Sequence, residues 1–149
     1  MLIDYTDKIR NYIPRKSSIT KIVLHNTDGT AKSAVNWFMD PASKVSAHYI
    51  IDRGGTILKC VDEYNTAWHA GNNIINQCSI GIEIEAYQAS PNMTAEQEKV
   101  LVELIKELMI KYKITPENIG LHRFYKATKC PAYTFKTDEE FFRWRLNHF

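Results

Sequence analysis

The chain has 149 residues, of which 44% are hydrophobic and 24% are charged, and its formal net charge at pH 7 is +2. This length and composition are those of one ordinary globular domain that is long enough to build a real core. The nearly neutral charge argues against a dedicated nucleic-acid binder, which would carry a strong basic excess.

The start of the chain and its cysteines bear on where the protein is made. The opening residues, MLIDYTDKIRNY, include aspartates and no apolar run of signal-peptide length. No segment reaches the apolar length that spans a membrane. The cysteines number three, an odd count that argues against a disulfide framework. We therefore expect a protein made in the cytoplasm without a signal peptide, and without membrane contact.

The first half of the chain predicts a strand, a helix and a hairpin. Residues 21–25 (KIVLH) are a short apolar run typical of a buried strand, and NTDGT follows as a loop. Ala34, Trp37 and Phe38 then fall at helical spacing. The segment VSAHYIIDRGGTILKCV places two β-rich runs around a Gly-Gly pair, which predicts a hairpin. Residues 65–77 (NTAWHAGNNIINQ) are loop-like.

The segment SIGIEIEAY, residues 79–87, alternates cleanly and predicts a strand. Because successive side chains of a strand point to opposite faces, one face is apolar and the other carries a glycine and two carboxylates. The two sets are Ile80, Ile82 and Ile84 against Gly81, Glu83 and Glu85. We expect the apolar face to pack on helices and the glycine to leave room above the other face.

Two capping boxes predict the helices of the second half. Thr94 with Gln97 opens a long helix, which Ile114-Thr115-Pro116 ends. Its apolar stripe consists of Leu101, Leu104, Ile105, Leu108 and Tyr112. Residues 119–122 (IGLH) predict a short strand. Thr137 with Glu140 opens a last helix, and the apolar side expected for it consists of Phe142, Leu146 and Phe149.

Strands mixed with helices, including an antiparallel hairpin, predict an α/β fold. We expect residues 1–149 to form a single domain, with a central mixed β-sheet flanked by helices.

Three residues have the chemistry of metal ligands. His25 ends the first predicted strand, His122 ends the last one, and Cys130 follows His122 in a polar loop. A catalytic zinc keeps three such protein ligands and leaves its fourth position for water. The residue types alone leave two alternatives open. Cys130 could be a buried thiol among hydrogen-bonded histidines, or a nucleophile that His122 activates.

Five segments, taken in order, resemble one known family: IVLHNT, VSAHYIIDRGGTI, AWHAGNN, SIGIEIEAY and HRFYKATKCP. They are similar to the zinc-dependent N-acetylmuramoyl-L-alanine amidases, which include amidase-type phage endolysins, bacterial wall amidases and peptidoglycan recognition proteins. The resemblance runs from about Ile22 to Tyr133. It implies the fold of that family and hydrolysis of the amide between N-acetylmuramic acid and L-alanine in peptidoglycan. The alternative is a non-catalytic module that binds peptidoglycan.

The resemblance implies a role for each candidate of the catalytic centre. His25, His122 and Cys130 correspond to the zinc ligands. Glu83 corresponds to a general base, which physical chemistry supports because a carboxylate near zinc-activated water can take its proton. Thr128 stands where many relatives have a lysine, and its hydroxyl can donate one hydrogen bond to the oxyanion.

Other residues receive more modest interpretations. The resemblance places Trp68 and His69 beside the substrate groove, although Trp68 could equally be a hydrophobic plug under its loop. Without the resemblance, Glu83 and its neighbour Glu85 would simply face solvent at a strand edge. Glu85 is the weaker catalytic candidate, and we interpret it as a solvated or substrate-orienting carboxylate. We expect a structural role for His48. Two further side chains are interpreted as solvated charges, Lys126 and Lys129.

The biological setting follows from the same resemblance. A compact amidase without an export signal suits a phage endolysin that is released to the wall at host lysis. A host or prophage autolysin, or a cytoplasmic recycling amidase, fits the same facts. Peptidoglycan is the expected partner, zinc the expected cofactor and a monomer the expected state.

Overall fold

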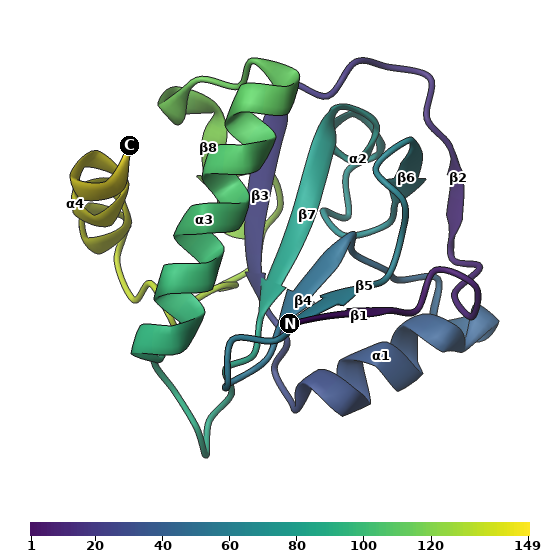
Figure 1. Ribbon diagram of the computed structural model, residues 1–149, viewed down its shortest axis with the longest axis horizontal. Coiled ribbons are helices and arrows are strands. Elements are labelled where there is room, and N and C mark those ends of the chain that lie inside the picture. The colour runs from purple at the N-terminus through teal and green to yellow at the C-terminus, as the bar shows by residue number, and fades with distance from the viewer.

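A six-stranded mixed sheet organises the computed structural model, which describes residues 1–149 (Figure 1). The strand order is β1-β5-β4-β7-β3-β8, and only β4 and β5 pair antiparallel. The strands are β1 (Leu2–Asp4), β3 (Lys21–Asn26), β4 (Tyr49–Ile51), β5 (Ile57–Lys59), β7 (Ser79–Ile84) and β8 (Ile119–Leu121). The predicted hairpin is confirmed as β4 and β5, and the strand predicted at residues 119–122 as β8.

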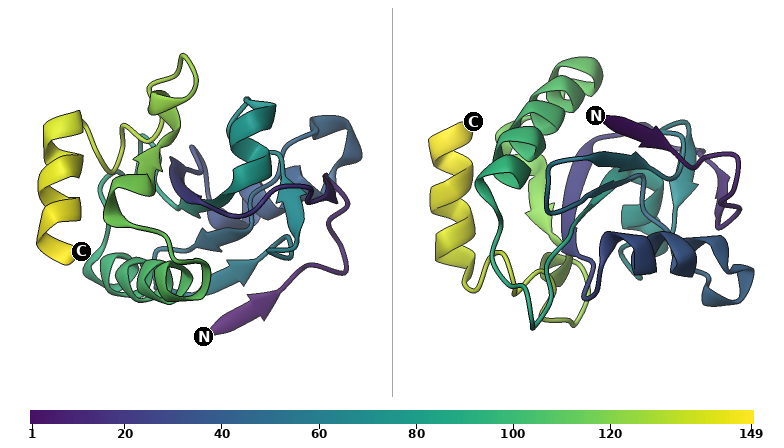
Figure 2. Two further views of the ribbon diagram at one scale, coloured as in Figure 1. Left: turned by 90° about the horizontal axis from the view of Figure 1, so that it is seen from above. Right: turned by 60° about the horizontal axis from the view of Figure 1, so that its bottom comes forward.

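Helices cover both faces of this sheet, which confirms the predicted fold class. They are α1 (Ala31–Met39), α2 (Asn73–Cys78), α3 (Ala95–Tyr112) and α4 (Asp138–His148), with short 3₁₀ turns η1 (Pro41–Ser43), η2 (Pro116–Asn118) and η3 (His122–Phe124). Figure 2 shows α3 on one face of the sheet and α2 on the opposite face. None of the helices is long and apolar enough to cross a membrane.

The main core lies between the sheet and α3. The isoleucine face predicted for β7 is confirmed, because Ile80, Ile82 and Ile84 are fully buried in this core. They share it with the α3 residues Leu101, Leu104, Ile105 and Leu108. Thr94 caps α3, with both hydrogen bonds of the predicted capping box in place.

A smaller core on the other face packs α1 against β4 and β5. Ala34, Val35 and Phe38 of α1 meet Ile50 and Leu58 there. Side chains alternate along each strand. The residues of β3 and β7 that do not face α3 therefore point to the α1 side of the sheet. Near the ends of β3 and β7 this face borders a cavity rather than apolar core.

The loop expected at residues 65–77 is wrong in two places. Asn65–Ala67 forms β6, which pairs with β2 (Tyr12–Pro14) in a separate two-stranded sheet. Helix α2 then begins after Asn72, whose side chain accepts a hydrogen bond from the Ile75 backbone N–H. Both elements escaped prediction because one depends on a distant strand and the other on a single short capped turn.

The face expected for the last helix is wrong for two of its three residues, whereas the third, Phe149, packs against the main core as expected. Phe142 and Leu146 are 45% and 82% exposed, whereas Phe141 is fully buried and Trp144 packs against the same core.

The last helix begins at Thr137 as predicted, but its capping box is incomplete. The Glu140 carboxylate accepts from the Lys136 backbone N–H instead of that of Thr137.

Candidate metal centre and active site

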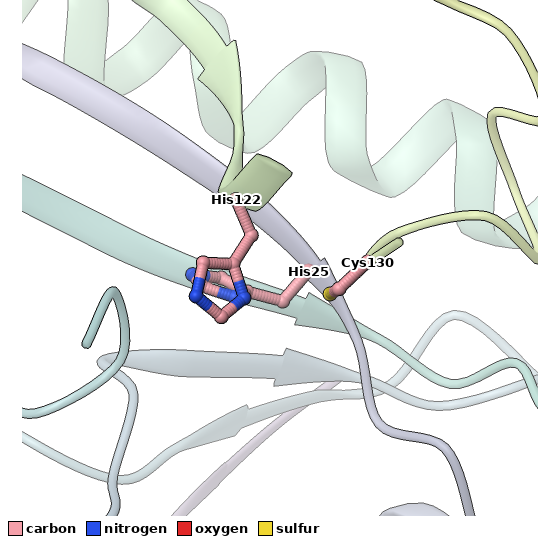
Figure 3. Close-up of side chains that lie close together, drawn as sticks. All are labelled: His25, His122 and Cys130. Atoms are coloured by element: carbon pink, nitrogen blue, oxygen red, sulfur yellow. The ribbon is translucent and has the colours of Figure 1, made fainter. Parts of the chain in front are cut away.

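Three side chains from separate parts of the chain converge at one end of the sheet. His25 comes from β3, His122 begins η3 directly after β8, and Cys130 lies on the loop that follows (Figure 3). One ligand atom of each lies within 4.8 Å of the other two. No other three histidine, cysteine or acidic side chains come together in this way. The structure therefore brings together the three residues that the sequence suggested as a metal site.

The hydrogen bonds of the two histidines leave the same nitrogen available on each ring. His122 Nε2 donates to the carbonyl oxygen of Ala70 at 3.0 Å, and His25 Nε2 lies 2.9 Å from His69 Nδ1. Nδ1 is therefore the nitrogen left for a metal in both cases. Burial, followed by the neighbouring His122, holds the pKa of His25 well below its ordinary value, so this ring is neutral.

The Cys130 loop is tied to the end of β3 by Asn26. The backbone N–H of Asn26 donates to Cys130 Sγ at 3.3 Å, and its side-chain oxygen accepts from the backbone N–H of Tyr133 at 3.0 Å. Burial, with a smaller contribution from the charge of Glu83, raises the pKa of the Cys130 thiol to about 12. The free thiol is therefore protonated at neutral pH, and a cation beside it would be needed to form the thiolate.

Glu83 lies directly beside the first histidine. It pairs with His25 in the parallel ladder of β3 and β7, and both residues line one cavity. The residue is 9% exposed, and its buried Oε2 atom has no hydrogen-bond partner. Burial raises the pKa of Glu83 to about 8. A solvent-facing strand edge is thus the wrong interpretation, because β7 is a central strand between β4 and β3.

Glu85 is also buried, but it has a structural partner. Its Oε2 atom accepts a hydrogen bond from the Arg53 backbone N–H at 2.9 Å. The expectation of a solvated carboxylate is therefore wrong for Glu85. Of the two glutamates, only Glu83 lines the cavity beside the three candidate ligands.

A zinc ion fits this set of donors. Tetrahedral ligands at zinc–nitrogen and zinc–sulfur distances of about 2.0–2.3 Å lie about 3.3–3.8 Å from one another. The separations here, up to 4.8 Å, are close to that geometry. The Glu83 oxygen has no partner, and burial raises the pKa of the Cys130 thiol. A cation in this buried site would stabilise the ionised forms of both groups. Two imidazoles and a sulfur leave a fourth coordination position free.

The cavity in front of these ligands has a volume of about 690 Å³. Trp68 lines it and is half-buried, and the exposed Thr128 lines it from the Cys130 loop. Thr128 Oγ1 accepts a hydrogen bond from the Cys130 backbone N–H at 3.2 Å, which leaves its hydroxyl proton free to donate. Lys126 and Lys129 are exposed, in agreement with their interpretation as solvated charges.

The remaining two predicted histidines lie deeper in the structure. His69 is 6% exposed, and both of its ring nitrogens have partners within the protein, His25 and Ser79. His69 also lines the cavity, so its contact with substrate stays a prediction, while its ring lies directly behind His25. His48 is fully buried and accepts from the Gly81 backbone N–H at 3.1 Å, which confirms its expected structural role.

Sequence reasoning missed the residues that hold the loop at 69–70 in place. Asn76 of α2 accepts hydrogen bonds from the backbone N–H groups of both His69 and Ala70, at 3.3 and 2.8 Å. It also missed Lys44 and Val45, which line the cavity from the α1 side. The asparagine-rich run after AWHAG was the available signal for Asn76, because asparagine side chains often bond nearby backbone.

Comparison with known sequences places the chain in a family. The sequence model described as N-acetylmuramoyl-L-alanine amidase (Amidase_2) matches residues 15–133. The chain belongs to this family. The match contains all three candidate ligands, Glu83 and the loop that carries Thr128.

Two proteins named as N-acetylmuramoyl-L-alanine amidases are similar to this chain over parts of their length. N-acetylmuramoyl-L-alanine amidase A of Achromobacter lyticus is 33% identical over 100 residues, which is 66% of this chain and 55% of that protein. The amidase XlyA of Bacillus subtilis is 29% identical over 130 residues, 80% of this chain and 42% of that protein. The chain thus spans about half the length of these relatives.

Solved structures share the fold of this chain. PlyL superimposes with a TM-score of 0.80 at 21% identity, covering 98% of this chain and 94% of that one. The catalytic domain of XlyA gives a TM-score of 0.77 at 20% identity and covers both chains almost completely, 100% and 99%. At these identities the likeness establishes the fold alone.

Proposed function

We propose that this chain hydrolyses the amide bond between N-acetylmuramic acid and L-alanine in bacterial peptidoglycan, with zinc bound by His25, His122 and Cys130. Membership of the amidase family supports the reaction class. The observation that carries the proposal is the cavity where the three ligands meet the unpartnered carboxylate oxygen of Glu83. We further propose that residues 1–149 act as one catalytic unit.

Bound zinc would supply Lewis-acid chemistry, polarising the scissile carbonyl and lowering the pKa of water towards about 7. The positive charge of a bound zinc would favour the ionised form of the buried Glu83 carboxyl. The Glu83 carboxylate then takes a proton from the attacking water, whose oxygen forms the new bond to the carbonyl carbon. Glu83 then gives that proton to the nitrogen of L-alanine as the carbon–nitrogen bond breaks. The carboxylate of Glu83 thereby returns to its starting state. The lactyl carboxylic acid that forms releases the second proton of the water to solvent, so the products are a free lactyl carboxylate and a stem peptide with a free amino terminus.

Two further residues complete the proposed site. The hydroxyl of Thr128 donates a hydrogen bond to the oxyanion that develops on the carbonyl oxygen. Trp68, at the wall of the cavity, offers an aromatic face and an indole N–H to a sugar or to the stem peptide. A related amidase, AmiD of Escherichia coli, has been solved in complex with anhydro-N-acetylmuramic acid-L-Ala-D-gamma-Glu-L-Lys, and a TM-score of 0.61 at 29% identity over 70% of this chain supports the comparison.

We propose a role as an endolysin or autolysin, acting on the wall after synthesis in the cytoplasm and release at host lysis. Support comes from the fold, which it shares with solved endolysins, among them a mutant endolysin from Bacillus subtilis with a TM-score of 0.80 at 21% identity.

Mass analysis of digested peptidoglycan tests the reaction directly. We expect stem peptides that begin with free L-alanine, together with glycan strands that keep intact sugars and carry free lactyl carboxylates. Cleavage within the glycan or within the stem peptide would contradict the proposal. Binding to walls without any release of peptide would instead identify a recognition module. Loss of peptide release on chelation, and its return with added zinc, tests the metal.

A further inference from the structure

Both candidate histidine ligands hydrogen-bond to one dipeptide, His69-Ala70, behind the metal site. His25 Nε2 contacts the ring of His69, and His122 Nε2 donates to the backbone carbonyl of the next residue, Ala70. The His25 and His69 rings meet edge to face, with centroids 5.0 Å apart and planes at 90°. Two adjacent residues of one loop therefore orient one ligand on β3 and another that directly follows β8.

The direction of each hydrogen bond behind His25 can be read from a single carbonyl group. Ser79 Oγ lies 2.6 Å from the carbonyl oxygen of Ile75, which can only accept, so the serine hydroxyl donates there. Ser79 Oγ must then accept from His69 Nε2–H at 3.1 Å. A neutral His69 with its proton on Nε2 has a lone pair on Nδ1, and it accepts from His25 Nε2–H. His25 is left with its Nδ1 lone pair facing the metal site.

The surrounding chain keeps this arrangement in place. A Cβ atom on Gly81 would lie 2.5 Å from Cγ of His69, so the ring fills the space that the glycine leaves open. Asn76, itself 4% exposed, holds the backbone of His69 and Ala70 through its side-chain oxygen. The imidazole of His69 thus has a defined position, two hydrogen bonds and almost no contact with solvent.

We propose that His69 is a positioning residue: by accepting from His25 Nε2–H, and being anchored through Ser79 to the Ile75 carbonyl, it fixes His25 in the tautomer that presents Nδ1 to zinc. The inference rests on the proposed function, because it assumes that His25 is a zinc ligand. Outer partners of this kind set the ring orientation and the basicity of a histidine ligand, which is how His69 contributes to metal affinity.

A matched pair of substitutions tests the proposal on metal affinity alone. Asparagine and leucine have nearly the same shape, but only His69→Asn keeps an acceptor at the position of Nδ1. Zinc affinity is measured by competition with a chromogenic chelator, and circular dichroism of the metal-free proteins checks the fold. We expect His69→Leu to bind zinc about 10- to 100-fold more weakly, and His69→Asn to recover most of that loss. Unchanged affinity in His69→Leu, or equal loss in both variants, would overturn the proposal.

A second measurement uses the unaltered protein and does not depend on the variants folding. Long-range proton–nitrogen correlation spectra report which ring nitrogen of each histidine carries the proton. We expect His25, His69 and His122 all to carry it on Nε2, with and without zinc. A proton on His25 Nδ1 in the metal-free protein would refute the proposed hydrogen bond from His25 to His69.

These readouts separate the inference from the proposed function. A wild-type protein that binds zinc with the expected tautomers but leaves peptidoglycan intact would contradict only the proposed function. A protein that cleaves the predicted bond but shows no effect of His69→Leu on zinc affinity would contradict only the inference.

Discussion

His25 and Glu83 stand directly opposite each other on the parallel strands β3 and β7, and both side chains border the same cavity. The pairing register of two central strands thus sets a candidate metal ligand beside a candidate base. Since neither residue lies on a flexible loop, their separation does not depend on a closing motion. Such placement on rigid elements is what a preorganised catalytic site requires.

Replacing Glu83 by glutamine should separate metal binding from catalysis. We expect Glu83→Gln to keep its zinc and to lose activity by about 10²- to 10⁴-fold, the usual contribution of a general base. Zinc content by elemental analysis and release of stem peptide from purified walls are the two measurements. Glu85→Gln is the matched control, because that side chain only accepts a hydrogen bond from the Arg53 backbone. Full activity in Glu83→Gln would remove the residue from the mechanism.

Thr128 should affect the reaction rate without affecting the metal. We expect Thr128→Val to lower kcat by about 10²-fold, at the low end for loss of one oxyanion donor, while zinc content stays unchanged. Thr128→Ser keeps the hydroxyl that also accepts from the Cys130 backbone N–H, so it should remain close to wild type. If valine and serine variants were equally active, oxyanion stabilisation would have to come from another group.

Cys130 should behave as a ligand rather than as a nucleophile. Cys130→Ser exchanges a thiolate for a poorly coordinating hydroxyl, so we expect zinc affinity to fall by more than the roughly 10- to 100-fold typical of an outer partner. Cys78→Ser should leave zinc affinity unchanged, because Cys78 lies outside the cluster of ligands. A chelator should abolish activity, and added zinc should restore it. Activity that survives chelation but is lost on thiol alkylation would instead favour a cysteine hydrolase.

Acid should destabilise the fold through buried histidines, and His48 allows a clean test. Burial lowers the pKa of His48 to about 4, from about 6.5 in the unfolded chain, despite its hydrogen bond to the Asn65 carbonyl. Between these values the unfolded state binds more protons, so stability falls as the pH drops from about 6.5 to 4. A shift of this size corresponds to roughly 3 kcal/mol. Urea unfolding of the metal-free proteins measures the free energy of unfolding at each pH. Between about pH 6.5 and 4 it should fall less in His48→Gln than in wild type, by about this amount. An equal fall in both proteins would contradict the assignment.

Gly81 should be intolerant of even one methyl group. The added Cβ of Gly81→Ala would lie 2.5–2.7 Å from three atoms of the His69 ring, which two hydrogen bonds hold in place. We expect the free energy of unfolding to fall by about 1–3 kcal/mol, as in other overpacked interiors. Gly54→Ala is the control, since its nearest neighbour, Asp52 Oδ1, would be 3.5 Å away. Chemical denaturation of both variants checks the comparison, and equal stability would show that the ring can move aside.

Local sequence signals predicted those elements whose causes are themselves local. The isoleucine face of β7 follows from the two-residue period of a strand, and the start of α3 follows from the Thr94–Gln97 capping box. The apolar side of α4 was predicted wrongly at Phe142 and Leu146, because adjacent stripes on a short aromatic helix compete. Contact with the main core decides for Phe141 and Trp144.

The amino-acid sequence by itself determined the family, the order of the main elements and the candidate ligands His25, His122 and Cys130, because residue type, period and spacing are properties of the chain alone. Only the tertiary structure decided that Glu83 is buried beside His25 and that His69 stands behind it. Those relationships arise from the order and register of the strands. Residues far apart in the chain become neighbours only when β3 and β7 pair at the centre of the sheet.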